Sequence, residues 1–71
     1  MMKEYMILGL RLIDGISLKE FERKFNEELL IIFQKEIEKL INKEYILINN
    51  KNIKLSHKGI DFANCVWGEF L

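Results

Sequence analysis

The stretch of sequence that decides the fold covers residues 45–59 and reads Tyr45-Ile46-Leu47-Ile48-Asn49-Asn50-Lys51-Asn52-Ile53-Lys54-Leu55-Ser56-His57-Lys58-Gly59. An apolar run over 45–48 meets a polar cluster over 49–52, and alternation of apolar and polar residues resumes over 53–55. This pattern is typical of two strands and a turn. Asn tolerates the left-handed backbone that tight turns require, so the stretch predicts a β-hairpin.

Helical patterns precede the hairpin. Residues 2–13 are apolar on nearly every side and stop at Asp14-Gly15, where Gly accepts the positive φ common just past a helix end. Ser17-Leu18-Lys19-Glu20 is a capping box and begins a short helix over 18–25. Gly9, inside the first helix, predicts a tight helix crossing.

Two longer helices complete the prediction, one over 27–42 and one over 57–70 that Ser56 can cap. Their expected core-facing residues are Leu29, Leu30, Phe33, Ile37, Leu40 and Ile41 in the first, and Ile60, Ala63, Val66, Trp67 and Phe70 in the second. The order α-α-α-β-β-α predicts a mainly α fold with a small β-hairpin, an α+β class that is winged-helix-like. Residues 1–71 are expected to form a single domain.

The overall composition restricts the classes of partner. Lys plus Arg and Asp plus Glu number 11 each, so no general positive field draws the chain to nucleic acid. The single Cys65 forms no internal disulfide, which favours a reducing compartment. No apolar run approaches the roughly 18 residues that span a membrane. We therefore expect a cytoplasmic protein without a membrane partner.

No pattern in the sequence predicts a catalytic, cofactor-binding or metal site. His57 is the single histidine and lies beside Lys58 in the first turn of a predicted helix, which is typical of a solvated side chain. Cys65 has no neighbouring base to activate its thiol. The acidic pairs Glu27-Glu28 and Glu36-Glu38 have spacings that do not face one another on a helix.

Nucleic-acid binding is the first alternative that a winged-helix fold suggests. In that mode the third helix enters the major groove. Residues 27–44 hold five Glu against three Lys, so this element carries the wrong sign for contact with phosphates. Three lysines near the hairpin, Lys51, Lys54 and Lys58, offer at most a weak phosphate contact. We expect no nucleic-acid partner, and a freestanding DNA-binding protein or a small protein-interaction module remain the alternatives.

Several segments together resemble one family. They are Glu4-Tyr5-Met6-Ile7-Leu8-Gly9-Leu10-Arg11-Leu12, Asp14-Gly15-Ile16, Phe21 with Phe25, and Leu55-Ser56-His57-Lys58-Gly59 followed by Asn64, Val66, Phe70 and Leu71. In their order and spacing they resemble the C-terminal domain of the oxygen-independent coproporphyrinogen III oxidase family. These are radical S-adenosylmethionine (SAM) enzymes of haem and porphyrin biosynthesis, together with their haem-chaperone relatives.

The resemblance implies that the chain is a noncatalytic accessory part of a larger oxidoreductase-type protein. Such a parent carries a catalytic barrel with a 4Fe-4S cluster and S-adenosylmethionine, and this domain packs on or covers that barrel. One cysteine cannot hold such a cluster, so no cofactor is expected here. The residues do not separate a coproporphyrinogen oxidase from a haem chaperone.

Five residues are predicted as interdomain contacts, namely Arg11, Ile31, Ile32, Trp67 and Phe70. Ile31 and Ile32 lie off the core stripe of their helix, so they point toward solvent in an isolated domain. Arg11 is expected to pair with a carboxylate, and a partner within the domain is favoured over one across the interface. Exposed apolar surface of this kind also allows self-association.

Overall fold

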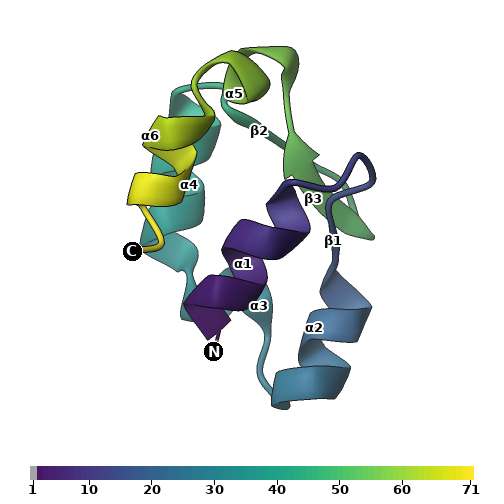
Figure 1. Cartoon of the computed structure of the whole chain (residues 1–71). Helices are drawn as coiled ribbons and strands as arrows, with labels where there is room; N and C mark the ends of the chain where they lie inside the picture. Colours follow the sequence, from purple (N-terminus) through teal and green to yellow (C-terminus); the bar gives the residue numbers. More distant parts are fainter. Residues whose placement is uncertain (1) are drawn as a thin grey trace.

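The computed structural model describes residues 2–71 (Figure 1). Its elements follow in the order α1 (Met2–Leu10), β1 (Ile16–Ser17), α2 (Leu18–Phe25), α3 (Leu29–Ile32), α4 (Gln34–Asn42), β2 (Ile46–Ile48), β3 (Asn52–Leu55), α5 (His57–Asp61) and α6 (Ala63–Gly68). In Figure 1, α4 and α6 lie on the opposite side of α1 from β1 and β3. The predicted α+β class with a small hairpin is confirmed.

The predicted hairpin is formed by β2 and β3, which pair antiparallel with Ile46 opposite Leu55 and Ile48 opposite Ile53. Its turn is built differently from the prediction. Asn49 Oδ1 accepts hydrogen bonds from the backbone N–H groups of Lys51 and Asn52, both at 2.7 Å. None of the hairpin asparagines has a positive φ. The side chain of Asn49 therefore closes the turn, and a left-handed backbone is not needed.

A third strand, β1, was not predicted. It pairs antiparallel with β3, with Ile16 opposite Ile53, so the sheet order is β1-β3-β2. Gly9 of α1 packs against this strand, because a Cβ on Gly9 would lie 2.4 Å from Ile16 Cγ1. The close packing predicted at Gly9 is confirmed, but its neighbour is a strand and not a second helix. A strand of two residues is too short to show an alternating pattern.

Two predicted helices are each divided in two. The helix expected over 27–42 begins at Leu29 and breaks at Phe33, where φ is −109° and ψ is 31°. The helix expected over 57–70 ends at Gly68 and breaks at Phe62, where φ is −113° and ψ is 37°. The first helix ends at Leu10 and not at residue 13, and a turn leads to Gly15 with a φ of 72°.

The core is formed by apolar side chains from nearly every element. These residues are Met6, Leu10, Ile16, Phe21, Leu29, Phe33, Ile37, Leu40, Ile46, Ile53, Val66 and Phe70. The Phe33 ring lies 6.3 Å from the Phe21 ring and 5.3 Å from the Phe70 ring, between centroids. Leu30, Ile41 and Ile60, which were expected in the core, are exposed. The prediction assumed that each of these residues lay in a continuous helix. The breaks at Phe33 and Phe62 change which side of each helix faces the core.

Both predicted serine caps are confirmed. Ser17 Oγ accepts from the N–H of Glu20 at 3.2 Å, and Ser56 Oγ accepts from the N–H of Gly59 at 2.9 Å. The Ser56 hydroxyl also donates to the carbonyl of Glu44 at 2.6 Å. Ser56 thus begins α5 and ties that helix to the end of α4.

Glu44 adopts a backbone conformation that favours glycine. The N–H of Tyr45 donates to the carbonyl of Leu40, and that of Glu44 to Ile41, which is the bonding of a Schellman motif. Glu44 occupies its left-handed position with a φ of 64°. Substitution of Glu44 by Gly is therefore expected to raise the free energy of unfolding by about 0.5–1 kcal/mol, measured by urea denaturation.

Asn42→Gly provides the matched control for this prediction. Asn42 is the last residue of α4 and is exposed, so Gly there only loosens a helix and is expected to cost about 0.5–1 kcal/mol. If Glu44→Gly and Asn42→Gly destabilised the protein equally, backbone strain at Glu44 would be disproved.

Candidate functional site

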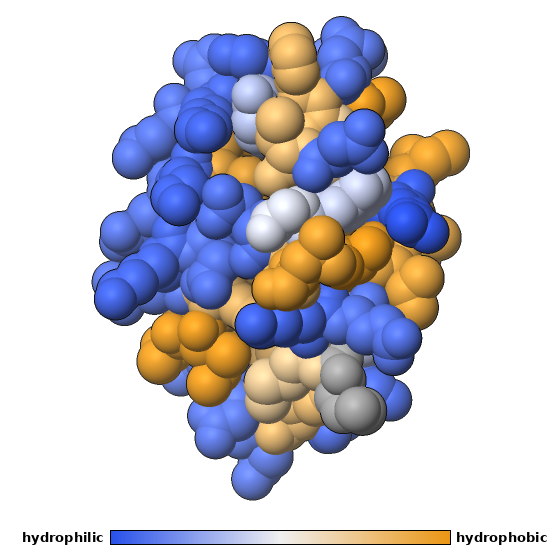
Figure 2. Space-filling view, turned by 60° about the vertical axis from the view of Figure 1, so that its left-hand side comes forward, coloured by the Kyte–Doolittle hydropathy of each residue, from blue (hydrophilic) through white to orange (hydrophobic). Residues whose placement is uncertain are grey.

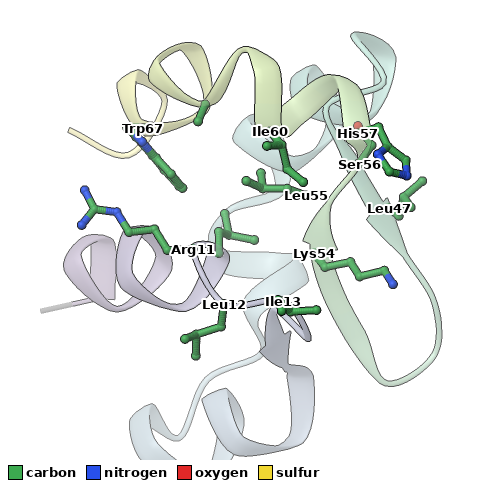
Figure 3. A pocket seen from close by; sticks show the side chains of 12 residues that line it. Arg11, Leu12, Ile13, Leu47, Lys54, Leu55, Ser56, His57, Ile60 and Trp67 are labelled. Carbon is green, nitrogen blue, oxygen red and sulfur yellow. The ribbon is translucent and has the colours of Figure 1, made fainter.

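An open groove lies between the end of α1, the hairpin and helices α5 and α6 (Figure 3). Its volume is about 490 Å³. The apolar part of its lining is Leu10, Leu12, Ile13, Leu47, Leu55, Ile60, Ala63 and Trp67, and the polar part is Arg11, Lys54, Ser56 and His57. Segments far apart in the sequence thus build one apolar surface with polar groups at its margin.

Leu12 and Ile13 face solvent because α1 ends before them. Leu12 is 64% exposed and Ile13 is 92% exposed, in the turn that precedes Gly15. Leu47 of β2 and Ile60 of α5 are also exposed along the groove. Large apolar side chains gathered on one open surface indicate an interaction site.

Arg11 and Trp67 meet at one end of the groove. The guanidinium carbon of Arg11 lies 5.4 Å from the centre of the Trp67 ring, and Figure 3 shows the two side chains on neighbouring segments. This is cation–π geometry. Arg11 was predicted to pair with a carboxylate inside the domain. This prediction is wrong, because no ion pair among the described residues involves Arg11 and its guanidinium lies over an aromatic ring. Arg11 is exposed, so its charge does not need a neutralising carboxylate.

The ionisable residues that line the groove are Arg11, Lys54 and His57, and this part of the described structure contributes no Asp or Glu to the lining. The whole chain has a formal net charge of zero. The lining therefore carries a net positive charge from Arg11 and Lys54, although the totals predicted no such field.

The five predicted contact residues do not lie together. Arg11 and Trp67 line the groove, whereas Ile31 and Ile32 are exposed on α3, with Ile31 at 66%. Phe70 is 1% exposed and packs against Phe33, so it belongs to the core and cannot offer contact surface. Leu12 and Ile13 were predicted to lie in the first helix, and Ile60 in the core. The sequence shows that these residues are apolar. It does not show that α1 ends at Leu10 or that the last helix breaks at Phe62, and these two features expose them.

A second face of the molecule, turned from the first view, mixes apolar and polar side chains. In Figure 2 the apolar atoms form several patches that are separated by hydrophilic ones, beside a broad hydrophilic area.

The residues that could ligate a metal ion are dispersed in the described part of the structure. His57 and Cys65 are both exposed and lie on different helices. Within residues 2–71, no three His, Cys, Asp or Glu side chains are grouped so that they could hold a metal ion. The residues present therefore do not fit an iron–sulfur cluster. None of the described helices is long and apolar enough to cross a membrane.

Three residues near the hairpin make contacts within the domain, namely Asn49, Asn52 and Lys58. Asn49 closes the turn, and the Asn52 side chain donates to the carbonyl of Asp14 at 3.1 Å. The Lys58 ammonium lies 5.7 Å from the centre of the Tyr45 ring.

Comparison with known proteins gives consistent matches. The family described as the HemN C-terminal domain matches residues 1–62. The heme chaperone HemW of Lactococcus lactis subsp. lactis (strain IL1403) is 32% identical over 69 residues, and the heme chaperone HemW of Bacillus subtilis (strain 168) is 35% identical over 69 residues. Each match covers 97% of this chain and 18% of the relative. No solved structure matches the chain, so the winged-helix likeness stays a prediction.

Proposed function

Because the chain belongs to the HemN C-terminal domain family, we propose that it is a noncatalytic accessory domain that docks on the catalytic barrel of a haem-related radical SAM protein. The relatives support this proposal, since the chain spans only 18% of their length. The larger remainder of such a protein is available to carry the chemistry.

We favour haem handling over the decarboxylation of coproporphyrinogen III for the parent protein. Both curated relatives are named heme chaperones, and they match nearly the whole of this chain. The proposed role of the chain is then to support a haem-trafficking protein, and the oxidase becomes the alternative.

A parent of this kind would use a 4Fe-4S cluster and S-adenosylmethionine for its chemistry. Iron–sulfur clusters are held by several Cys thiolates, and the chain has a single Cys65 that is exposed. The barrel would therefore supply the ligands, and this domain would supply contact surface.

The observation that carries the docking proposal is the exposure of Leu12 and Ile13 beside the apolar groove. Burial of a fully exposed Ile contributes about 1.5–3 kcal/mol. Ile13 has the highest exposed fraction, 92%, among the large apolar side chains of the described residues. We therefore assign the groove, with Ile13 in its lining, as the barrel-facing surface. The exposed Ile31 on α3 marks the competing surface.

Calorimetric titration tests the docking proposal. The partner is Bacillus subtilis HemW from which the 69-residue segment matched by this chain has been removed. Ile13→Asp is expected to weaken binding at least tenfold, because about 1.4 kcal/mol corresponds to a factor of ten. Ile31→Asp, the same change at an isoleucine of α3 that is 66% exposed, is expected to leave the affinity within about twofold.

Circular dichroism establishes that both variants keep the wild-type fold before they are titrated. A loss of affinity with Ile31→Asp but not with Ile13→Asp would move the docking surface to α3. Absence of binding by the unsubstituted chain would reject the accessory-domain proposal itself.

A further inference from the structure

We infer that the groove receives an apolar polypeptide segment of the catalytic domain that bears a carboxylate, with Arg11 as the carboxylate-binding residue. This inference rests on the proposed docking function and adds the chemistry of the partner.

Arg11 is held in place by Trp67 in a way that keeps its hydrogen-bond donors available. The guanidinium lies over the Trp67 ring, 5.4 Å from the ring centre. A guanidinium over an aromatic ring interacts through its positive charge, and its N–H groups stay free to donate to another partner. Among the hydrogen bonds and ion pairs of the described residues, none involves the Arg11 side chain. These unused donors can bind a carboxylate in bidentate geometry.

The charge of the groove selects the sign of its partner. Arg11, Lys54 and His57 line it, and no acidic side chain of the described residues does. A partner that brought Lys or Arg to this surface would face uncompensated repulsion, whereas a carboxylate would be attracted. The fourth polar residue of the lining is Ser56, whose hydroxyl already donates to the Glu44 carbonyl and so has no hydrogen left to donate to a partner.

The shape of the surface favours a polypeptide over a lipid bilayer. The apolar lining is concave, with a volume of about 490 Å³ between three segments of the chain. A ridge of side chains on a helix or strand fills such a groove. A bilayer surface would contact the projecting Ile13 but leave the concave lining uncovered.

A peptide titration followed by NMR tests the inference without the catalytic domain. The probe is an amphipathic Leu- and Glu-containing peptide, and its control is the same peptide with every Glu replaced by Gln. Trp67 is the only tryptophan, so its indole N–H gives one resolved signal inside the groove. The acidic peptide is expected to shift this signal and to bind more tightly than its Gln counterpart.

Two substitutions separate the role of Arg11 from that of charge in general. Arg11→Gln is expected to weaken binding of the acidic peptide by about threefold to tenfold and to remove the difference between the two peptides. The matched control is Lys24→Gln, because Lys24 also lies over an aromatic ring, 5.8 Å from the centre of Phe25, but outside the groove. It is expected to change the affinity by less than twofold.

Three outcomes would overturn the inference. They are equal binding of both peptides, equal effects of the two substitutions, and a Trp67 shift caused by vesicles of phosphatidylcholine and phosphatidylserine but by neither peptide. After any of these outcomes the docking proposal still stands if truncated HemW binds the chain and Ile13→Asp weakens that binding. Loss of that binding would reject the docking proposal, and with it this inference.

Discussion

Replacement of Gly59 by Ala is expected to unfold the protein at room temperature. A Cβ on Gly59 would lie 1.8 Å from the carbonyl oxygen of Tyr45, and that oxygen is fixed because it accepts a hydrogen bond from Ser56 at 2.9 Å. Backbone on both sides of the clash must move, so the cost is expected to be about 3 kcal/mol or more. A single small core rarely supplies more than about 3–5 kcal/mol of net stability, so this loss is decisive.

Thermal melting followed by circular dichroism measures this effect, and Gly68→Ala is its control. Gly68 is the last residue of α6, and a Cβ there has no heavy atom within 4 Å. Ala is a better helix former than Gly, so Gly68→Ala is expected to leave the protein as stable or to stabilise it by up to about 1 kcal/mol. A folded Gly59→Ala protein that melts within a few degrees of the wild type would refute the close approach of α5 to Tyr45.

Removal of the Phe21 side chain is expected to cost about 3–5 kcal/mol, the second large effect. Phe21 has no exposed surface and stands at the centre of an aromatic group, with ring centroids 5.7 Å from Tyr5, 4.8 Å from Phe25 and 6.3 Å from Phe33. Phe21→Ala leaves a cavity that the helices cannot close, because these neighbours come from separate elements.

Phe62→Ala is the matched control, since Phe62 is 49% exposed and stacks only on Tyr45, at 5.7 Å. Its loss is expected to cost about 1 kcal/mol. Urea unfolding of both variants gives the comparison. Similar midpoints for Phe21→Ala and Phe62→Ala would contradict the placement of Phe21 at the centre of the core.

Sequence predictions were confirmed at positions where the local backbone requires a particular residue type, such as a helix cap or a positive φ. Ser17 and Ser56 were predicted as helix caps and accept the expected hydrogen bonds. Gly15 was predicted to carry the positive φ after the first helix, and does so at 72°. The resemblance to the HemN C-terminal domain, drawn from the order of such features, is confirmed by the family match.

The helix breaks could not be read from the sequence because neither Phe33 nor Phe62 is a helix-breaking residue. Each break places an aromatic ring where a long-range partner lies, Phe33 against Phe70 and Phe62 against Tyr45. Tertiary packing thus overrides local helix propensity at these positions. Patterns calculated for uninterrupted helices then misplaced Ile60, which faces the groove.

The groove itself was predicted only in part. Arg11 and Trp67 were both predicted as contact residues. Their cation–π contact with each other was not predicted. Leu12 and Ile13 were noted as apolar yet assigned to a helix, because Gly15 marks the end of the turn and not the end of α1. The periodicity of apolar residues shows which side of a helix they occupy. Only the three-dimensional fold determines whether that side is buried.

The central position of β3 has a consequence for the order in which the chain folds. The two strands of the hairpin are neighbours in sequence and can pair locally, whereas the Asn52 side chain reaches Asp14 across 38 residues. Closing so long a loop costs entropy before it yields contacts, and it slows folding. We therefore expect β1 to join the sheet after β2 and β3 have paired, and we expect the rate-limiting step to be the docking of the α1–β1 corner onto the hairpin.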